Sequence, residues 1–183
     1  CPAGAVRLLP DVAGKKELYT GDRVFSTATL KMGRGNSGKL VTEVKKAMLK
    51  AAPPCELAIV DGSPGIGCPV IASVNGMDLV LVVAEPSGSG ISDLKRLCAT
   101  AATLQVQLAV CVNKYDVSPQ HTERIETFCS QQGIAFVGKI PFDPMAVRAV
   151  NEGTTVVDID CPAGRAVREI FAKLTALLAE RSI

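Results

Sequence analysis

Four short apolar runs recur through the middle of the chain, and each ends in polar or turn-forming residues. They are ELAIVDG (residues 56–62), DLVLVVAEP (78–86), QLAVCVNKYD (107–116) and IAFVGKIPFD (134–143). Each run is apolar nearly throughout, which is typical of strands covered on both faces in a parallel sheet. Longer amphipathic stretches separate the runs, and this alternation predicts βαβ units.

The amphipathic stretches predict helices between and after these strands. We expect helices over about residues 68–75, 89–104, 119–132, 144–151 and 163–181, and one more that begins near Ser37. The last helix carries apolar residues at the spacing of an amphipathic face, at Val167, Ile170, Phe171, Leu174, Leu177 and Leu178. The pattern therefore predicts an α/β protein of three layers, with a mostly parallel, Rossmann-like sheet and helices on both of its faces.

The first thirty residues follow a different pattern. AVRLL (5–9), KKELY (15–19) and DRVFSTATL (22–30) are short and half polar, with Pro, Asp and Gly between them. Such segments predict a β-ribbon rather than core strands. We expect residues 1–30 to form a linker or small subdomain, and residues 31–183 to hold the sheet.

The composition narrows the classes of function. The chain has 183 residues, 48% of them hydrophobic, which is enough to bury a sizeable core and argues against disorder. Its net charge of +2 is spread without a basic block, so we expect no nucleic-acid partner. No apolar run approaches the length of a membrane span, and the chain does not open on a leader-like pattern. A cytoplasmic protein is the resulting expectation.

Seven cysteines are present, an odd number at wide spacings, which argues against a disulfide framework and fits a reducing compartment. Cys68 and Cys161 lack a companion at the spacing of metal ligands, so we expect structural roles for both. Four others lie in apolar runs, where a free cysteine behaves as a small hydrophobic residue: Cys55, Cys98, Cys111 and Cys129.

Residues 33–40, GRGNSGKL, match the phosphate-binding loop pattern G-x-x-x-x-G-K-[ST] at every position except the last. Leu40 stands where that pattern needs a hydroxyl to ligate Mg²⁺. A Gly-rich turn into a helix still offers free NH groups, and Lys39 adds a positive charge. Ser37 and Lys39 are therefore candidates for a second-tier phosphate or subunit-interface element, with a plain helix cap as the alternative.

Asp61 follows an apolar run at an expected strand end. In open α/β sheets ligands bind beyond the carboxyl ends of the strands, and a carboxylate there can hold Mg²⁺ or its bound water. Gly62, Gly65 and Gly67 leave backbone NH groups unshielded toward a phosphate. Asp61 and Gly65 are thus candidate catalytic residues, and the alternative is an aspartate in an ordinary Gly/Pro turn.

The segment VNKYD places Asn113, Lys114 and Asp116 after the third apolar run. An amide beside a lysine and a carboxylate can read a purine edge by hydrogen bonds, while the aliphatic part of the lysine packs on the ring. The same residue types are common in turns. We take all three as candidate nucleotide-binding residues.

The segment KIPFDP follows the same logic after the fourth run. Pro141 and Phe142 can form a wall beside a base. Asp143 can either contribute to that site or cap the next helix, and the residue types alone do not decide between these roles.

GRGNSGKL, DGSPG and NKYD occur in the order of the phosphate, magnesium and guanine motifs of GTPases. However, Leu40 lacks the magnesium-ligating hydroxyl, and DGSPG is one residue longer than the usual D-x-P-G loop. Only 22 positions separate Lys39 from Asp61, which leaves no room for an additional strand and a switch segment. These three departures make a GTPase the less favoured interpretation, and it is kept as an alternative.

Several blocks of residues resemble the MinD/ParA/Mrp-type P-loop ATPases (the CobQ/CobB/MinD/ParA nucleotide-binding domain), specifically the branch with an inserted bacterial-ferredoxin domain. The blocks are NSGKLVTEVKKA, AIVDGSPGIGCPVIASVNGMDLVLVVAEPS, SDLKRL, VNKYD and GKIPFD, and the resemblance runs from Cys1 to about Gly153. CPAGAV at the start resembles the end of a ferredoxin motif, whose final Cys-Pro ligates a four-iron-four-sulfur cluster.

The resemblance implies an ATPase that binds ATP with Mg²⁺ and dimerises with ATP between its subunits. Its phosphate loop, Lys-Gly-Gly-x-Gly-Lys-Thr, would precede residue 1, together with the first strand. Cys1 would be the last cluster ligand, and residues 1–30 would be the remnant of the ferredoxin insert and its linker. By position, Asp61 would be the Walker B carboxylate near Mg²⁺ and Gly65 the switch II amide near the third phosphate. Asn113 would face the adenine, with Pro141 and Asp143 on the base side.

The implied task is to couple ATP hydrolysis to electron transfer or iron-sulfur cluster handling, with a redox or iron-sulfur protein as partner. The amides and lysines that neutralise the phosphates are not among these residues. We therefore expect residues 1–183 alone neither to bind ATP tightly nor to hydrolyse it. A GTPase-like nucleotide switch and a non-catalytic iron-sulfur or protein-interaction module remain the alternatives.

Overall fold

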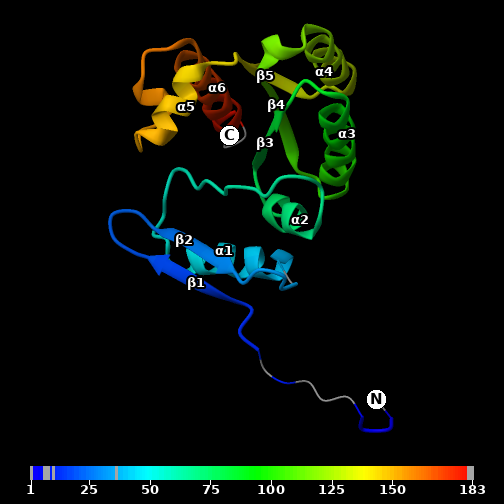
Figure 1. Cartoon of the computed structure of the whole chain (residues 1–183), viewed down its shortest axis with the longest axis vertical. Helices are drawn as coiled ribbons and strands as arrows, with labels where there is room; N and C mark the ends of the chain where they lie inside the picture. The colour runs from blue at the N-terminus through cyan, green and yellow to red at the C-terminus, as the bar shows by residue number, and fades with distance from the viewer. Residues whose placement is uncertain (1, 6–8, 10, 36, 181–183) are drawn as a thin grey trace. The chain divides into compact units, whose positions relative to one another are not determined.

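The computed structural model describes residues 2–5, 9, 11–35 and 37–180 (Figure 1). The chain divides into two compact units, residues 1–73 and residues 74–183. We call them the amino-terminal unit and the carboxyl-terminal unit, and each is described by itself. Among the described residues, no helix combines the length and the apolar character needed to cross a bilayer.

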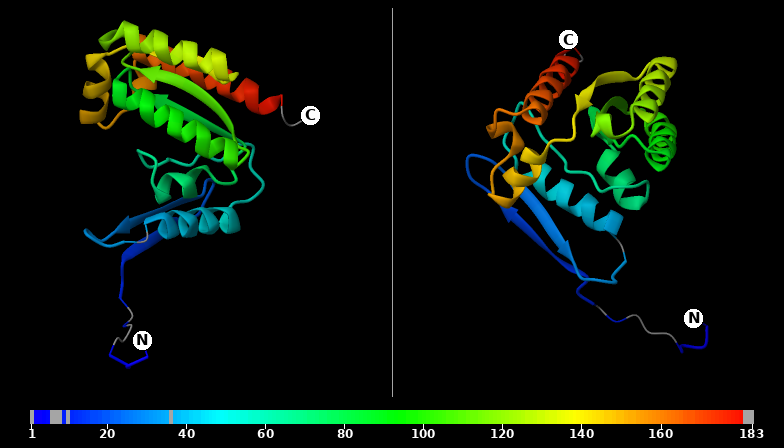
Figure 2. Two further views of the ribbon diagram at one scale, coloured as in Figure 1. Left: turned by 90° about the vertical axis from the view of Figure 1, so that its right-hand side faces the viewer. Right: turned by 45° about the horizontal axis from the view of Figure 1, so that its top comes forward.

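The amino-terminal unit contains an antiparallel hairpin packed on a helix. Strands β1 (Gly14–Tyr19) and β2 (Phe25–Leu30) pair along their whole lengths, which confirms the second and third segments of the predicted β-ribbon. Most of the first predicted segment, residues 5–9, lies outside the described residues. Helix α1 (Ser37–Ala51) lies along the hairpin in all three ribbon views (Figures 1 and 2). The Ser26 hydroxyl of β2 donates a hydrogen bond to the Val44 carbonyl of α1 at 2.9 Å, so the two elements are joined by a polar contact as well as by packing.

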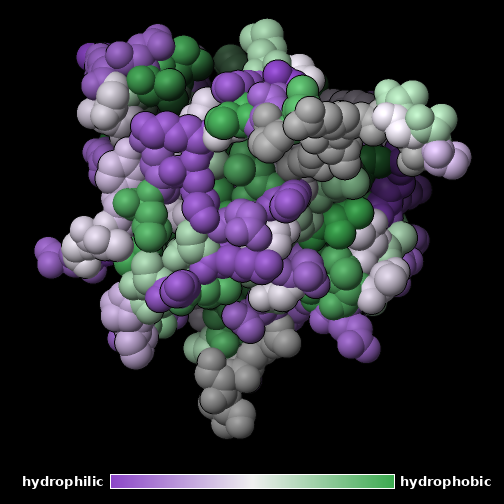
Figure 3. Space-filling model, turned by 90° about the horizontal axis from the view of Figure 1, so that it is seen from below, coloured by the Kyte–Doolittle hydropathy of each residue, from purple (hydrophilic) through white to green (hydrophobic). Residues whose placement is uncertain are grey.

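The tip of the hairpin carries an exposed aromatic pair. Tyr19 and Phe25 are cross-strand partners whose rings stack with centroids 6.0 Å apart. On the face shown in Figure 3, bands of polar side chains run between apolar ones. Because cross-strand aromatic contacts stabilise antiparallel pairs, the Tyr19–Phe25 stack closes the end of a two-stranded ribbon that has little core of its own.

Helix α2 (Cys68–Val74) is fastened to α1 by a lysine. Lys45 Nζ donates hydrogen bonds to the carbonyl oxygens of Ala72 and Ser73, at 3.0 and 2.9 Å. The last carbonyls of a helix lack intrahelical donors, and a cation near them also complements the helix dipole. Burial lowers the pKa of Lys45 from its usual value. The lysine therefore satisfies the open end of α2 at some desolvation cost.

The prediction of a strand at residues 56–62 is wrong. This fully described segment has no regular secondary structure, and most of its side chains are exposed, Ile59 at 74%. An apolar run forms a buried strand only where a neighbouring strand supplies hydrogen bonds and other elements cover its faces. In the amino-terminal unit, the described strands β1 and β2 pair with each other, and residues 56–62 pair with neither of them.

The carboxyl-terminal unit is built on a parallel three-stranded sheet in the order β3-β4-β5. The remaining three predicted strands are confirmed as β3 (Leu79–Ala84), β4 (Gln107–Asn113) and β5 (Ala135–Ile140). The helices expected after each strand are also present. They are α3 (Gly88–Thr103), α4 (Pro119–Gln132), α5 (Pro144–Asn151) and α6 (Pro162–Ala179), with 3₁₀ turns η1 (Tyr115–Val117) and η2 (Val156–Asp158).

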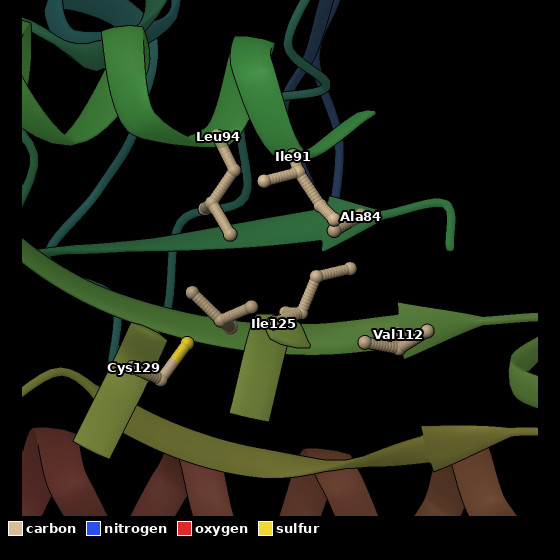
Figure 4. Close-up of a cluster of buried hydrophobic side chains, with 7 residues drawn as sticks. Ala84, Ile91, Leu94, Val112, Ile125 and Cys129 are labelled. Carbon is tan, nitrogen blue, oxygen red and sulfur yellow. The ribbon is translucent and has the colours of Figure 1, made fainter. Parts of the chain in front are cut away.

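Helices cover both faces of this sheet. On one face, α3 and α4 bury a cluster that includes Leu94 and Ile125, the latter fully inaccessible (Figures 1 and 4). On the other face, Ile170 of α6 packs on Ala109, Cys111 and Val137. This arrangement confirms the predicted three-layer α/β fold.

Strand β5 contains a bulge. Val110 of β4 lies opposite Phe136, but the next residue, Cys111, lies opposite Gly138, so one residue of β5 is extra. Gly138 has φ 156°, and a Cβ there would lie 2.8 Å from Cγ1 of Ile170. The absence of a side chain at Gly138 thus lets α6 approach the sheet. The bulge also determines the pairing beyond it, where Asn113 of β4 lies opposite Ile140 of β5.

The cysteines mostly behave as expected from sequence. Burial raises the pKa of Cys111 and of Cys129 to about 11, so both remain protonated and act as hydrophobic residues. Cys161 has a structural role, because its Sγ accepts the Gly164 N–H at 3.3 Å and caps α6. Cys55 is exposed, contrary to the prediction, because it begins the irregular segment that replaces the expected strand.

Candidate functional site

The three strands of the carboxyl-terminal unit end side by side. The pairing places Ala84 of β3 beside Val112 of β4, and Asn113 of β4 beside Ile140 of β5. The loops that follow β3, β4 and β5 therefore leave from one edge of the sheet, the edge at which open α/β proteins bind ligands. The predicted base-side residues lie at the end of β4 and in the segments that follow β4 and β5.

The loops after β3 and β4 are joined by an ion pair. Lys114 Nζ lies 3.2 Å from a carboxylate oxygen of Glu85, and both side chains are largely exposed. Lys114 has a left-handed backbone with φ 54°, a conformation that costs a non-glycine residue about 1–2 kcal/mol. Glu85 was not a candidate from the sequence. Its one signal is that a charged residue directly follows an apolar strand.

The loops after β4 and β5 are joined by Asp116. Its Oδ1 accepts the backbone N–H of Phe142 at 2.8 Å. The loop that carries Asp116 is itself held at the start of α4, where the Thr122 hydroxyl donates to the Tyr115 carbonyl at 2.8 Å. The carboxylate therefore orders the β5–α5 loop, a role that the sequence did not indicate.

Asp143 caps two helices at once. Its Oδ1 accepts the N–H of Met145 in the first turn of α5 at 3.0 Å, and its Oδ2 accepts the N–H of Ala163 in the first turn of α6 at 3.1 Å. These backbone hydrogen bonds, Ala163 first, hold the pKa of Asp143 below its usual value. Of the two roles left open by sequence, the helix cap is confirmed.

Asn113 differs from these anchored neighbours. It ends β4, its side chain is half-buried, and its amide forms no hydrogen bond with any described residue. Phe142, in the adjoining loop, exposes 54% of its surface. The sheet edge thus combines fixed loops with an amide that can both donate and accept, and with an exposed ring, which are the groups that bind a planar polar base.

Asp61 and Gly65 lie in the amino-terminal unit. Asp61 is exposed, and its carboxylate forms no hydrogen bond or ion pair with a described residue. Gly65 has φ 86°, and no atom lies within 4 Å of the position a Cβ would take. The carboxylate and the neighbouring glycine backbone are therefore both accessible.

Ser37 and Lys39 lie in the first turn of α1, beside the start of α2. A Cβ on Gly38 would lie 3.1 Å from both the Cβ and the carbonyl oxygen of Cys68. Gly38 thus permits close packing of α1 on the first residue of α2. This packing brings Ser37 and the exposed Lys39 to the end of the same glycine-rich loop that contains Gly65.

Asp61 is the described candidate for holding a metal ion. Within the described part of the chain, no three His, Cys, Asp or Glu side chains group as a metal site. Magnesium is usually bound by one or two carboxylates together with water and substrate phosphates, so the free Asp61 suits it. A four-iron cluster needs several thiolates, which these residues do not bring together. Cys1, the predicted cluster ligand, lies outside the described residues.

Two solved structures resemble the chain in three dimensions. The MinD cell division protein of Aquifex aeolicus matches with a TM-score of 0.58 and 24% identity, over 76% of this chain and 59% of that protein. The cell division ATPase MinD of Pyrococcus furiosus matches with a TM-score of 0.61 and 17% identity, over 78% and 59%. The chain has the MinD fold. The parallel sheet with helices on both faces is the part of the expected architecture that this likeness supports.

Several curated proteins are related to the chain in sequence. An uncharacterised protein of Methanocaldococcus jannaschii is 29% identical over 79% of this chain. An uncharacterised ATP-binding protein of the same organism is 33% identical over 65% of the chain, and an iron-sulfur cluster carrier protein of Pyrococcus furiosus is 30% identical over 78%. The chain spans 48%, 46% and 54% of these relatives, about half the length of each. No protein-family model matches it.

Proposed function

We propose that the chain is the larger, carboxyl-terminal part of a cytoplasmic P-loop ATPase of the MinD/ParA type that works as a homodimer. In this proposal the residues at the ends of β4 and β5 bind the adenine base. The coupled task is iron-sulfur cluster handling or electron transfer. The proposal as a whole is supported by the MinD fold and by a relative named as an ATP-binding protein. The coupled task is supported by relatives named as iron-sulfur cluster carriers.

The observation that carries the proposal is the contrast between Asn113 and its neighbours. Glu85, Lys114, Asp116 and Asp143 all have partners that fix the loops, whereas the half-buried amide of Asn113 has none among the described residues. A half-buried amide gains free energy from a hydrogen-bonding partner. Its donor and acceptor match those of an adenine edge.

The proposal gives the other candidate residues the following roles. The stem of Lys114 and the side of Pro141 would flank the base, while Asp116 and Asp143 hold the loops. Asp61 would hold Mg²⁺ through a bound water, and the Gly65 amide would meet the third phosphate. Ser37 and Lys39 would approach the phosphates or the partner subunit as a second tier. Bound Mg²⁺ would supply charge neutralisation at the phosphates.

The iron-sulfur part of the proposal rests on relatives and on Cys1. A cluster ligated by Cys1 in an intact protein would make this chain the ATPase module of a redox or cluster-transfer protein, with a second iron-sulfur protein as partner. A non-catalytic iron-sulfur module would also use Cys1 as a cluster ligand, but it would not need the free amide of Asn113.

The GTPase alternative is disfavoured by the geometry at Asp116. A carboxylate that reads guanine accepts two N–H groups of the base, most favourably one on each oxygen. The Asp116 Oδ1 instead accepts the N–H of Phe142 at 2.8 Å. Adenine recognition through Asn113 requires no such carboxylate.

The test is a titration of ¹⁵N-labelled residues 1–183 with ADP and GDP, each with Mg²⁺, observed by two-dimensional NMR. We expect ADP to shift the amides of residues 113–116 and 141–143 with a Kd on the order of 1 mM, which corresponds to about 4 kcal/mol of binding. Asn113→Ala removes the ADP shifts, while Asn151→Ala, at the exposed end of α5, keeps them.

Equal or stronger shifts with GDP, or ADP shifts that survive Asn113→Ala, would contradict the proposal. The proposal assigns the main phosphate site to residues outside 1–183. Tight binding of ATP, or Mg²⁺-dependent hydrolysis of ATP, by residues 1–183 alone would contradict that assignment. In a longer protein that carries this chain with a lysine-bearing phosphate loop, Asp61→Ala abolishes ATP hydrolysis. A normal rate there would remove Asp61 from the magnesium site.

A further inference from the structure

Three side-chain links cross the candidate site in series. Glu85 and Lys114 join the loops after β3 and β4, Asp116 joins the loops after β4 and β5, and Asp143 joins the β5–α5 loop to α6. The middle link is the one that spans the two loops that contain the base-side candidates. It therefore controls where one of these loops lies relative to the other.

We propose that Asp116 is a positioning residue that holds the β5–α5 loop beside Asn113 and does not contact the base. This inference rests on the proposed function and adds the reason for base selectivity at the same site. The Asp116 Oδ1 lies 2.8 Å from the Phe142 nitrogen, within the range of charge-assisted hydrogen bonds. The acceptor is a side chain of one loop and the donor is the main chain of the other, so the hydrogen bond sets the loop's path whatever side chain occupies position 142.

The neighbours of Phe142 explain why this hydrogen bond matters. Pro141 has no N–H to offer, so it cannot anchor the loop through its own amide. Asp143 is fixed toward α5 and α6 by the two helix caps. Phe142 lies between Pro141, which has no N–H, and Asp143, whose carboxylate caps the two helices. The Phe142 N–H donates the hydrogen bond that Asp116 accepts.

The same geometry predicts which base is preferred. With Asp116 Oδ1 accepting the Phe142 N–H, the Asn113 amide is a half-buried group at this edge that has both a donor and an acceptor without a partner among the described residues, and it suits the paired donor and acceptor of adenine. Guanine would need two acceptors, for its ring N–H and its amino group, and one oxygen of Asp116 already accepts the Phe142 N–H. The aspartate of NKYD therefore favours adenine indirectly, by fixing the loop, although the motif itself resembles a guanine reader.

The first arm of the test needs no nucleotide. Amide hydrogen exchange of Phe142 is measured by NMR in the wild-type chain and in three variants: Asp116→Ala, Asp116→Asn and Asp93→Ala. Loss of the acceptor in Asp116→Ala should accelerate Phe142 exchange at least about tenfold. Asp116→Asn keeps a carbonyl acceptor and should stay close to wild type. Asp93 is an exposed carboxylate of α3, so its variant should leave the Phe142 amide unchanged. An unchanged Phe142 amide in Asp116→Ala overturns the positioning role, whatever nucleotide binds.

The second arm repeats the ADP and GDP titrations on the same proteins. A positioning role predicts that Asp116→Ala weakens ADP binding at least about fivefold while Asp116→Asn retains it, as expected for loss of one ordering hydrogen bond. If wild type binds GDP and Asp116→Asn loses it, Asp116 reads guanine directly and the inference is wrong. If the Phe142 amide responds to Asp116→Ala but wild type binds neither nucleotide, the proposed function fails and the link between the loops stands.

Discussion

Replacing Lys45 with methionine tests how the amino-terminal unit holds helix α2. Methionine keeps the length and apolar stem of lysine but removes the ammonium that donates to the Ala72 and Ser73 carbonyls. Both acceptors are backbone groups at a helix end, so they cannot find new partners within the helix. We expect α2 to open more readily in Lys45→Met.

The expected magnitude follows from the two hydrogen bonds. A hydrogen bond to a charged group contributes about 1.5–3 kcal/mol, but here one ammonium makes both, and its burial offsets part of the gain. We expect the free energy of local opening of α2 to fall by about 2 kcal/mol, which accelerates amide exchange about 30-fold. Hydrogen exchange with mass spectrometry on peptides that cover residues 68–78 measures this change.

The matched control is Lys46→Met, one position along α1. Lys46 is 69% exposed and pairs with Glu43 at 3.5 Å, an exposed ion pair whose contribution is at most about 1 kcal/mol. If the two variants exchange alike in α2, the Lys45 hydrogen bonds do not stabilise the helix and the reasoning is refuted.

The lowered pKa of Lys45 adds a dependence on pH. Between this lowered value and the usual 10.5, the unfolded chain binds a proton at Lys45 that the folded chain has released. Stability therefore rises with pH across that window, and the rise is absent in Lys45→Met. An identical pH profile for both proteins would show that burial does not act on this ammonium.

Three further predictions concern the carboxyl-terminal unit and the cysteines. Ile125→Ala, at a fully buried position in the cluster of Figure 4, should lower the free energy of unfolding in urea by about 3 kcal/mol, and a change under about 1 kcal/mol would contradict the packing. Because the pKa of Asp143 is lowered, its stabilisation is present above the ordinary aspartate pKa and is lost as pH falls through the lowered value. The difference in Tm between wild type and Asp143→Ala should therefore shrink in acid, and a constant difference would argue against the charged cap. Exposed Cys68 should be alkylated in the native protein, while Cys111, with a pKa near 11 from burial, reacts only after unfolding, as peptide mass spectrometry can show.

The sequence predicted elements well where local pattern and long-range pairing agree. Strands β3, β4 and β5 were expected from their apolar runs and turn-forming ends, and helix α4 was placed at its observed bounds, Pro119–Gln132. The run at residues 56–62 has the same local pattern, yet it forms no strand. Whether an apolar run pairs depends on a partner elsewhere in the chain, which hydrophobic periodicity does not report.

The site was predicted less completely for the same physical reason. Residue types were enough to single out Asn113, Asp116 and Asp143, because polar groups that follow buried strands gather at one sheet edge. Their partners depend on how neighbouring loops are aligned, so the pairing of Glu85 with Lys114 could not be read from the sequence. The nucleotide-binding roles of Asn113, Lys114, Asp116, Pro141 and Asp143 remain predictions, as do the assignments of Ser37, Lys39, Asp61, Gly65 and Cys1.

The bulge in β5 determines where the following loop begins relative to the end of β4. Because β5 uses one residue more than β4 over the same span, Asn113 lies beside Ile140 where an unbulged pairing would have placed Lys139. Deleting one residue from β5 would pull Phe142 back by about 3.3 Å, the rise of one strand residue. That displacement exceeds the tolerance of the 2.8 Å hydrogen bond to Asp116. The extra residue thus acts as a spacer, and homologues with shortened strands at this position would need another way to fasten the loop.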